Sequence, residues 1–343
     1  MRLGVEAALV RSRVVQGDVE VADGAVVAVG LASPNGRGIA VPGFVDLQVN
    51  GFAGVDFAHA DDAGYRRAGE ALFETGVTSY LPTFITAPEE ELVASLREVP
   101  TSTDGARILG VHLEGPFLSP ERLGAHPVGA RRDPDLELLS RLLDAGPIRL
   151  VTLAPELPGA HDLIRTLLAR GITVSFGHSD ATADEANTGF DLGVHTVTHL
   201  FNAMRPFHHR DPGIAGTALA RENVVVQMIL DGVHLAPETA GFVWRVARGR
   251  LALVTDFTAA PYGRTPEGVL AGSTAPMIEA VRNLHARGAS FEEAALAASE
   301  IPARVVADPT AGRLEVGLSA DVVVLTDGLE IERVLVAGED RLS

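Results

Sequence analysis

The chain contains no cysteine among its 343 residues. This absence excludes disulfides, thiolate metal ligands and a cysteine nucleophile. Any metal site must therefore use His, Asp and Glu side chains.

The chain also lacks an excess of basic side chains and any long apolar run. It carries 28 Lys and Arg against 45 Asp and Glu, for a formal net charge of −17. That balance disfavours nucleic acid as a partner, although a local site can still bind a small anion. No run reaches the ~20 apolar residues of a membrane span, and arginines interrupt residues 1–15, so no secretory signal is predicted. We expect a cytoplasmic protein with neither a nucleic-acid nor a membrane partner.

The middle of the chain alternates β-type runs with helical patterns. Eight such strand–helix repeats predict a (β/α)₈ TIM-type barrel. The alternative is a doubly wound open sheet, but no G-x-G-x-x-G or phosphate-binding loop follows the first strand. The predicted strands are Phe44–Val49, Thr78–Thr83, Ile108–Glu114, Ile148–Leu153, Ile172–Gly177, Val194–His199, Val224–Leu230 and Leu251–Asp256.

The two ends of the chain differ from this middle. Both contain short β-type runs separated by turn glycines, such as GDVEVADGAVVAVG near the start and GRLEVGLSADVVVL near the end. We therefore predict a small β-sandwich domain formed by residues 1–41 and 309–343, with residues 42–308 forming the barrel.

One stretch, Gly177 to Arg210, carries an imidazole at each of two predicted strand ends. His178 closes the run ITVSFGHS and His199 closes VHTVTHL, with the helical pattern ATADEANTGFDLG between them. A strand–helix–strand unit places its two strands parallel, so both histidines face the same mouth of the barrel. Two imidazoles on rigid strands suit a divalent transition metal. A single histidine at a strand end is more often an ordinary polar residue. Residues at the other strand ends therefore decide whether a metal site is predicted.

Those other ends supply carboxylates. Glu114 is the only carboxylate in its apolar strand, and a buried Glu is rare unless it is paired or bound to metal. Asp256 follows the apolar run LALVT, where it could also merely cap the next helix. His126 stands in a rigid Gly-Ala-His-Pro loop that can reach the same mouth. Three protein ligands, an open position and a further carboxylate form the pattern of a hydrolytic metal site.

These motifs resemble the N-acetylglucosamine-6-phosphate deacetylase family of the amidohydrolase superfamily, nearly end to end. The resemblance is carried by PGFVDLQVNG, VHLEGPFLSPERLGAHP, GHSDAT, THLFNAM, RDPGIAG, DGVHL, LVTDFTAA and PARVVADPTAGRLEVGLSADVVVL. It implies deacetylation of N-acetylglucosamine-6-phosphate in amino-sugar metabolism, a barrel with a small β-sandwich, and a homodimer.

The resemblance also implies roles for individual residues. Asp256 is expected to be the general base and then the general acid, and His126 to stabilise the oxyanion. One divalent ion is expected, Zn²⁺ first and Fe²⁺ or Mn²⁺ as alternatives, because Gln48 and Asn50 replace the His-x-His pair of two-metal relatives. The expected metal ligands are Glu114, His178 and His199, and the expected substrate-binding residues are Ala125, His126, Asn202, Ala203, Arg210, His234, Leu270, Ala271, Gly272 and Ser273.

The sequence departs from the family between Asp256 and Gly272. This segment, FTAAPYGRTPEGVLA, is shorter than the family's usual insert, and Ala275-Pro276-Met277 replaces its Leu-Thr-Met. The edge of the substrate pocket is therefore expected to differ. Two alternatives stay open: a related amidohydrolase acting on another N-acyl sugar or cyclic amide, and a non-catalytic sugar-phosphate-binding paralogue.

Overall fold

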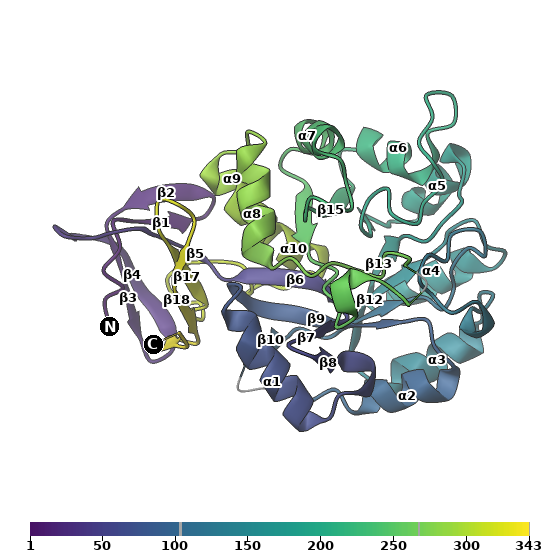
Figure 1. Cartoon of the computed structure of the whole chain (residues 1–343), viewed down its shortest axis with the longest axis horizontal. Helices are drawn as coiled ribbons and strands as arrows, with labels where there is room; N and C mark the ends of the chain where they lie inside the picture. Colours follow the sequence, from purple (N-terminus) through teal and green to yellow (C-terminus); the bar gives the residue numbers. More distant parts are fainter. Residues whose placement is uncertain (103–104, 267, 343) are drawn as a thin grey trace.

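The computed structural model describes residues 1–102, 105–266 and 268–342. Figure 1 shows a barrel with its helices and, beside it, a smaller β domain in which both chain termini lie. Among the described residues, no helix is both long and apolar enough to cross a membrane.

Eight parallel strands form the barrel, as predicted from the alternation of β-type and helical runs. Neighbours along the barrel are hydrogen-bonded in sequence order from β6 to β16, with the short β10 (Arg107–Ile108) also pairing with β9. The first and last strands meet through the Val49–Phe257 bridge, so the sheet is nearly closed, and the open-sheet alternative is wrong. The barrel strands are β6 (Phe44–Val49), β9 (Val77–Ile85), β11 (Val111–Glu114), β12 (Ile148–Leu153), β13 (Thr173–Phe176), β14 (Thr196–Val197), β15 (Val225–Ile229) and β16 (Leu251–Val254).

Helices connect the strands and cover the barrel. The capping box of Thr182 and Glu185 begins the helix between the two histidine-bearing strands, which agrees with its predicted position. The helices are α1 (Asp62–Phe73), α2 (Glu89–Arg97), α3 (Leu136–Ala145), α4 (Ala160–Ala169), α5 (Ala183–Asp191), α6 (Gly213–Ala220), α7 (Pro237–Val246), α8 (Met277–Ala286), α9 (Phe291–Ala297) and α10 (Glu300–Val305).

The small domain is built from both ends of the chain, as predicted. Its larger sheet has the order β19-β18-β17-β5-β1-β2, so N-terminal and C-terminal strands share one sheet. The pair β3 (Asp18–Ala22) and β4 (Ala25–Leu31) forms the second sheet. The strands of the larger sheet are β1 (Ala7–Val10), β2 (Arg13–Gln16), β5 (Ile39–Pro42), β17 (Val322–Leu325), β18 (Ile331–Val336) and β19 (Glu339–Asp340).

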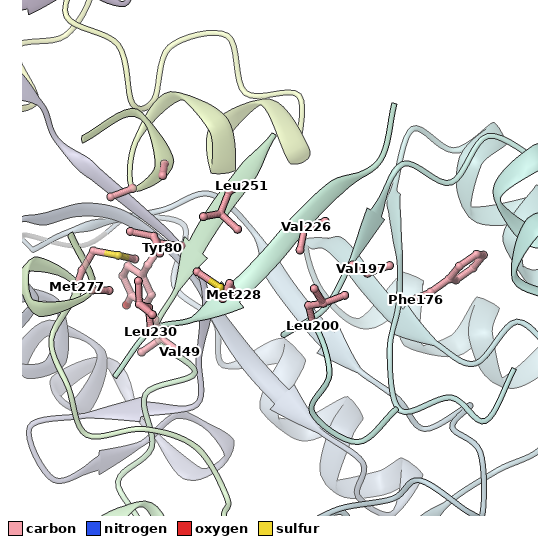
Figure 2. Close-up of a cluster of buried hydrophobic side chains, with 14 of the residues drawn as sticks. Val49, Tyr80, Phe176, Val197, Leu200, Val226, Met228, Leu230, Leu251 and Met277 are labelled. Atoms are coloured by element: carbon pink, nitrogen blue, oxygen red, sulfur yellow. The ribbon is translucent and has the colours of Figure 1, made fainter. Parts of the chain in front are cut away.

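Alternation along the strands sorts the barrel side chains into two layers. Val226 and Met228 of β15 pack in the layer between strands and helices, together with Leu251 and Phe176 (Figure 2). Ile229 belongs instead to a cluster that includes Leu47 and Leu150 of other strands and Ala303 of α10. Apolar packing thus fixes the strands, while their C-terminal ends remain available for polar groups.

Candidate active site

Three of the predicted site residues follow barrel strands directly and have an unusual backbone. His178, His199 and Asp256 all have positive φ, at 49°, 26° and 51°. Residues with a side chain adopt this region infrequently, and it concentrates at functional sites. This turn of the backbone explains why β13 and β14 end at Phe176 and Val197, before the predicted strand ends at Gly177 and His199.

Glu114, His178 and His199 meet at the centre of the mouth. The Glu114 Oε1 atom lies 3.1 Å from His178 Nε2 and 2.8 Å from His199 Nε2. The two Nε2 atoms are 3.2 Å apart, and all three residues are buried. Two imidazole nitrogens and a carboxylate oxygen converging this closely form a donor set that suits a divalent transition metal.

The surroundings of these residues hold their donor atoms toward that point. The Nδ1 atom of His178 lies 2.9 Å from the Arg122 carbonyl oxygen, which leaves Nε2 free for a metal. Gln48 donates from Nε2 to Glu114 Oε1 at 3.1 Å. Although burial alone would raise it, hydrogen bonds from His126, His178 and His199 hold the pKa of Glu114 well below its usual range.

Asp256 follows β16 at the same mouth, and the charge of Glu114 acts on it. Asn50 donates to its Oδ1 atom at 2.7 Å, so the amide at the end of β6 orients this carboxylate. Burial, with the charge of Glu114 second, raises the pKa of Asp256 to about 8. A cation held by Glu114 would offset that negative charge and keep Asp256 available as a base.

His126 is placed as a neutral hydrogen-bond donor. The Thr86 backbone N–H donates to its Nδ1 atom at 3.3 Å, and the Thr86 hydroxyl lies 2.8 Å from the same atom. Because Nδ1 accepts, Nε2 carries the proton, and it lies 3.6 Å from Glu114 Oε2. Burial, followed by the nearby His178, lowers the pKa of His126 to about 4.

A cavity of about 1160 Å³ opens above these groups. His234 lines it, and Asp231 orients His234 by accepting from its Nδ1 atom at 2.8 Å and its backbone N–H at 2.9 Å. The other predicted residues in the described lining are Ala125, His126, Asn202, Ala203, Leu270, Ala271 and Gly272.

Two predicted substrate-binding residues lie outside this described lining. The Ser273 hydroxyl accepts the backbone N–H of Ala275 at 3.0 Å. Arg210 is exposed, and its Nη1 atom contacts His209 Nε2 at 2.8 Å.

Several supporting residues were not predicted from the sequence. Thr86 and Asp231 orient the two cavity-lining histidines His126 and His234. Asp231 stands three residues before His234, so this spacing was a usable signal. Thr86 lies 40 positions from His126, and only the fold brings that pair together.

The chain is similar to known proteins over most of its length. Residues 39–340 match the amidohydrolase family, which is metal-dependent. The human N-acetylglucosamine-6-phosphate deacetylase is 40% identical over 89% of this chain and 83% of its own length.

Solved structures of deacetylases are also similar to this chain. The N-acetylglucosamine-6-phosphate deacetylase of Thermotoga maritima superposes with a TM-score of 0.91 at 31% identity, covering 100% of this chain and 99% of its own. A mutant of the Mycobacterium smegmatis deacetylase, in complex with N-acetyl-D-glucosamine-6-phosphate, also has a TM-score of 0.91, at 34% identity over 99% of this chain and 98% of its own. The chain therefore belongs to the amidohydrolase family and, within it, to the N-acetylglucosamine-6-phosphate deacetylases.

Proposed function

We infer that this chain hydrolyses the acetamide of N-acetylglucosamine-6-phosphate to give glucosamine-6-phosphate and acetate. The observation that carries the inference is the buried Glu114–His178–His199 cluster with Asp256 beside it, at the mouth of a barrel that belongs to this deacetylase family. The chain contains no lysine, so a lysine Schiff base is not available to it. The intact donor set argues against a non-catalytic paralogue.

Glu114, His178 and His199 would hold one divalent ion, with Zn²⁺ as the first candidate and Fe²⁺ or Mn²⁺ as alternatives. When bound, such an ion acts as a Lewis acid and lowers the pKa of a coordinated water. The first strand supports a single ion, because Gln48 and Asn50 offer amides that already bond to Glu114 and Asp256. Amides are much poorer ligands than imidazoles for these metals.

The chain's own residues then perform the proton transfers. Asp256 takes a proton from the attacking water as the water oxygen bonds to the acetamide carbon. The Nε2–H of His126 donates to the oxygen on which negative charge develops, and one good donor of this kind contributes roughly 3–4 kcal/mol. As the carbon–nitrogen bond breaks, Asp256 returns the proton to the leaving amine.

The lining residues Ala125, His126, Asn202, Ala203 and His234 would hold the sugar and its phosphate, with Leu270–Gly272 at the edge. Because Arg210 is outside the described lining of its own cavity, we propose that it reaches the phosphate in the second subunit of a homodimer. Apolar side chains exposed near Arg210 and His234 in the sequence fit such an interface: Phe207 and Val233 are 50% and 61% exposed.

The test is acetate release from N-acetylglucosamine-6-phosphate and from unphosphorylated N-acetylglucosamine by the zinc-loaded protein. We expect kcat/KM to be at least about 100-fold higher for the phosphorylated sugar, since an arginine–phosphate contact is charge-assisted. Equal rates would contradict phosphate recognition, and no release from either sugar would contradict the deacetylase function.

A further inference from the structure

Beside the metal cluster, Asp180 connects three segments that the chemistry uses. It follows the metal-ligand candidate His178 by two residues. Its Oδ1 atom accepts from Nε and Nη2 of Arg122 at 2.7 and 2.6 Å, and its Oδ2 atom accepts from Nη1 of Arg205 at 2.9 Å. Asp180 is 26% exposed, so these ion pairs are partly shielded from water.

The first arginine belongs to the loop that carries His126. The Arg122 carbonyl oxygen lies 2.9 Å from His178 Nδ1, so the same residue that pairs with Asp180 also orients a metal-ligand candidate. The Ser119 backbone N–H donates to the His178 carbonyl at 2.9 Å and fixes the beginning of this loop. A shift of Arg122 would therefore move both His126 and the imidazole of His178.

The second arginine belongs to the loop that carries Asn202, Ala203 and Arg210. Arg205 donates through Nε and Nη2 to Asp211 Oδ2 at 2.9 and 2.7 Å, and Asp211 directly follows Arg210. The Arg205 backbone N–H donates to the Ser179 carbonyl at 2.9 Å. The continuous chain Arg122–Asp180–Arg205–Asp211 thus links this loop to the His126 loop.

We propose that Asp180 is a positioning residue that fixes both substrate loops relative to the metal ligand His178. The proposal rests on the deacetylase function inferred above. The Arg122 arm sets the orientation of His178 and His126, and the Arg205 arm sets the phosphate-binding loop. The carboxylate makes its contacts through both oxygens, which is a geometry that matches two guanidinium partners.

Three variants separate the two arms: Arg122→Met, Arg205→Met and Asp180→Ala. Arg122→Met keeps the backbone carbonyl that bonds to His178 but removes the guanidinium that anchors it to Asp180. It should weaken Zn²⁺ affinity by about 10-fold, a loss typical of disturbing a group that orients a ligand. Arg205→Met should leave Zn²⁺ affinity unchanged, raise KM for N-acetylglucosamine-6-phosphate, and reduce the preference for phosphorylated over unphosphorylated sugar by about 10-fold. Asp180→Ala should show both effects.

Asp191→Asn is the matched control, because Asp191 pairs with Arg221 at 2.5 Å in an ion pair that touches neither substrate loop. It should leave Zn²⁺ affinity, KM and phosphate preference unchanged. Zn²⁺ affinity is measured by competition with a chromophoric chelator, and folding of each variant by thermal unfolding of the metal-free protein.

The proposal is overturned if Asp180→Ala lowers the melting temperature but keeps wild-type Zn²⁺ affinity, KM and phosphate preference. It is also overturned if both arm variants give the same pattern of losses. If the wild-type protein released no acetate, the deacetylase function would fail, and Zn²⁺ affinity would still decide whether the Arg122 arm positions His178.

Discussion

Asp46 is a carboxylate inside the barrel, and in the described structure its hydrogen-bond partners are all neutral. Replacing it should therefore change how the free energy of unfolding depends on pH. Its side chain is fully buried at the first strand. The backbone N–H groups of Thr255 and Gln48 each donate to its Oδ1 atom at 3.2 Å, and the Thr255 hydroxyl bonds to Oδ2 at 2.5 Å. Despite these bonds, burial raises the pKa of Asp46 to about 6.

The direction of the pH effect follows from the raised pKa. Between pH 3.8, the ordinary value for Asp, and pH 6, the unfolded chain releases a proton that the folded protein still holds. The free energy of unfolding therefore falls as pH rises through this window and levels off above it. A shift of about two pKa units corresponds to a loss of roughly 3 kcal/mol.

We expect Asp46→Asn to remove this loss. The asparagine carbonyl can accept the same two backbone N–H groups, and its amide can donate to the Thr255 hydroxyl oxygen. The proton of that hydroxyl can then be donated to the Gln48 carbonyl oxygen, which lies 3.4 Å from the Thr255 hydroxyl oxygen. The variant should match the wild type near pH 4 and exceed it by up to about 3 kcal/mol at pH 7.

The assay is urea unfolding of the metal-free wild-type and Asp46→Asn proteins at several pH values from 4 to 7.5. Metal-free protein is used so that no bound cation alters the field at Asp46. Two stability curves that run parallel across this range would show that burial of Asp46 does not raise its pKa, and would refute the reasoning.

Three further predictions concern the reaction. Asp256→Asn should retain fold and metal but lower kcat by about 10²- to 10⁴-fold, because the amide cannot accept the proton; a near-normal kcat in the metal-loaded variant would place the base elsewhere. The segment after Asp256 is short, and the small side chains of Ala87 and Ala259 line the cavity, so larger acyl groups should fit. We expect the rates of hydrolysis of N-propionyl and N-butanoyl substrates to lie within about tenfold of the rate for the acetyl substrate, and Ala87→Phe to remove this tolerance selectively. Strict acetyl specificity in the wild type would contradict this prediction. Arg210→Ala and Asp256→Asn should each be nearly inactive alone. Randomly mixed dimers should recover roughly a quarter of wild-type activity, because in a mixed dimer the Asp256→Asn chain supplies its Arg210 to the site that contains the other chain's intact base. Mixed dimers as inactive as their parents would place Arg210 in its own subunit's site.

The strand ends made the centre of the site predictable from sequence. Glu114 and Asp256 each follow an apolar run with no other charge, so the run fixes both the strand and the end at which the carboxylate appears. His178 and His199 flank a helix of the right length for a parallel crossover. Periodicity could therefore place these four residues at one mouth without knowledge of any distance.

The supporting contacts could not be predicted in the same way. Asp180 lies 58 positions from Arg122 in the sequence. The acidic residues near it are typical of the beginning of any helix, so they do not point to an ion pair with that arginine. Its pairing depends on how two loops fold over the barrel mouth, which no local period encodes. The predicted strand ends at Gly177 and His199 also lie beyond the observed ends at Phe176 and Val197, because hydrophobic alternation does not reveal where a backbone turns to positive φ.

The partner-dependent part of the site is a different case. The role of Arg210 across a subunit interface rests on the family resemblance, because its exposed position in the single chain does not by itself form a phosphate site. The domain limits at residues 41 and 309 likewise stay predictions, although β5 ends at Pro42 and leads directly into the first barrel strand at Phe44.

The proposed deacetylase activity depends on one metal ion held by Glu114, His178 and His199. The most direct measurement is a titration of the metal-free protein with Zn²⁺, in which acetate release from N-acetylglucosamine-6-phosphate and bound zinc are measured together. We expect no release without metal and full activity at one zinc per chain, with His199→Ala binding no zinc tightly and remaining inactive. Activity that needs two tightly bound ions per chain, or that persists in the metal-free protein, would contradict it.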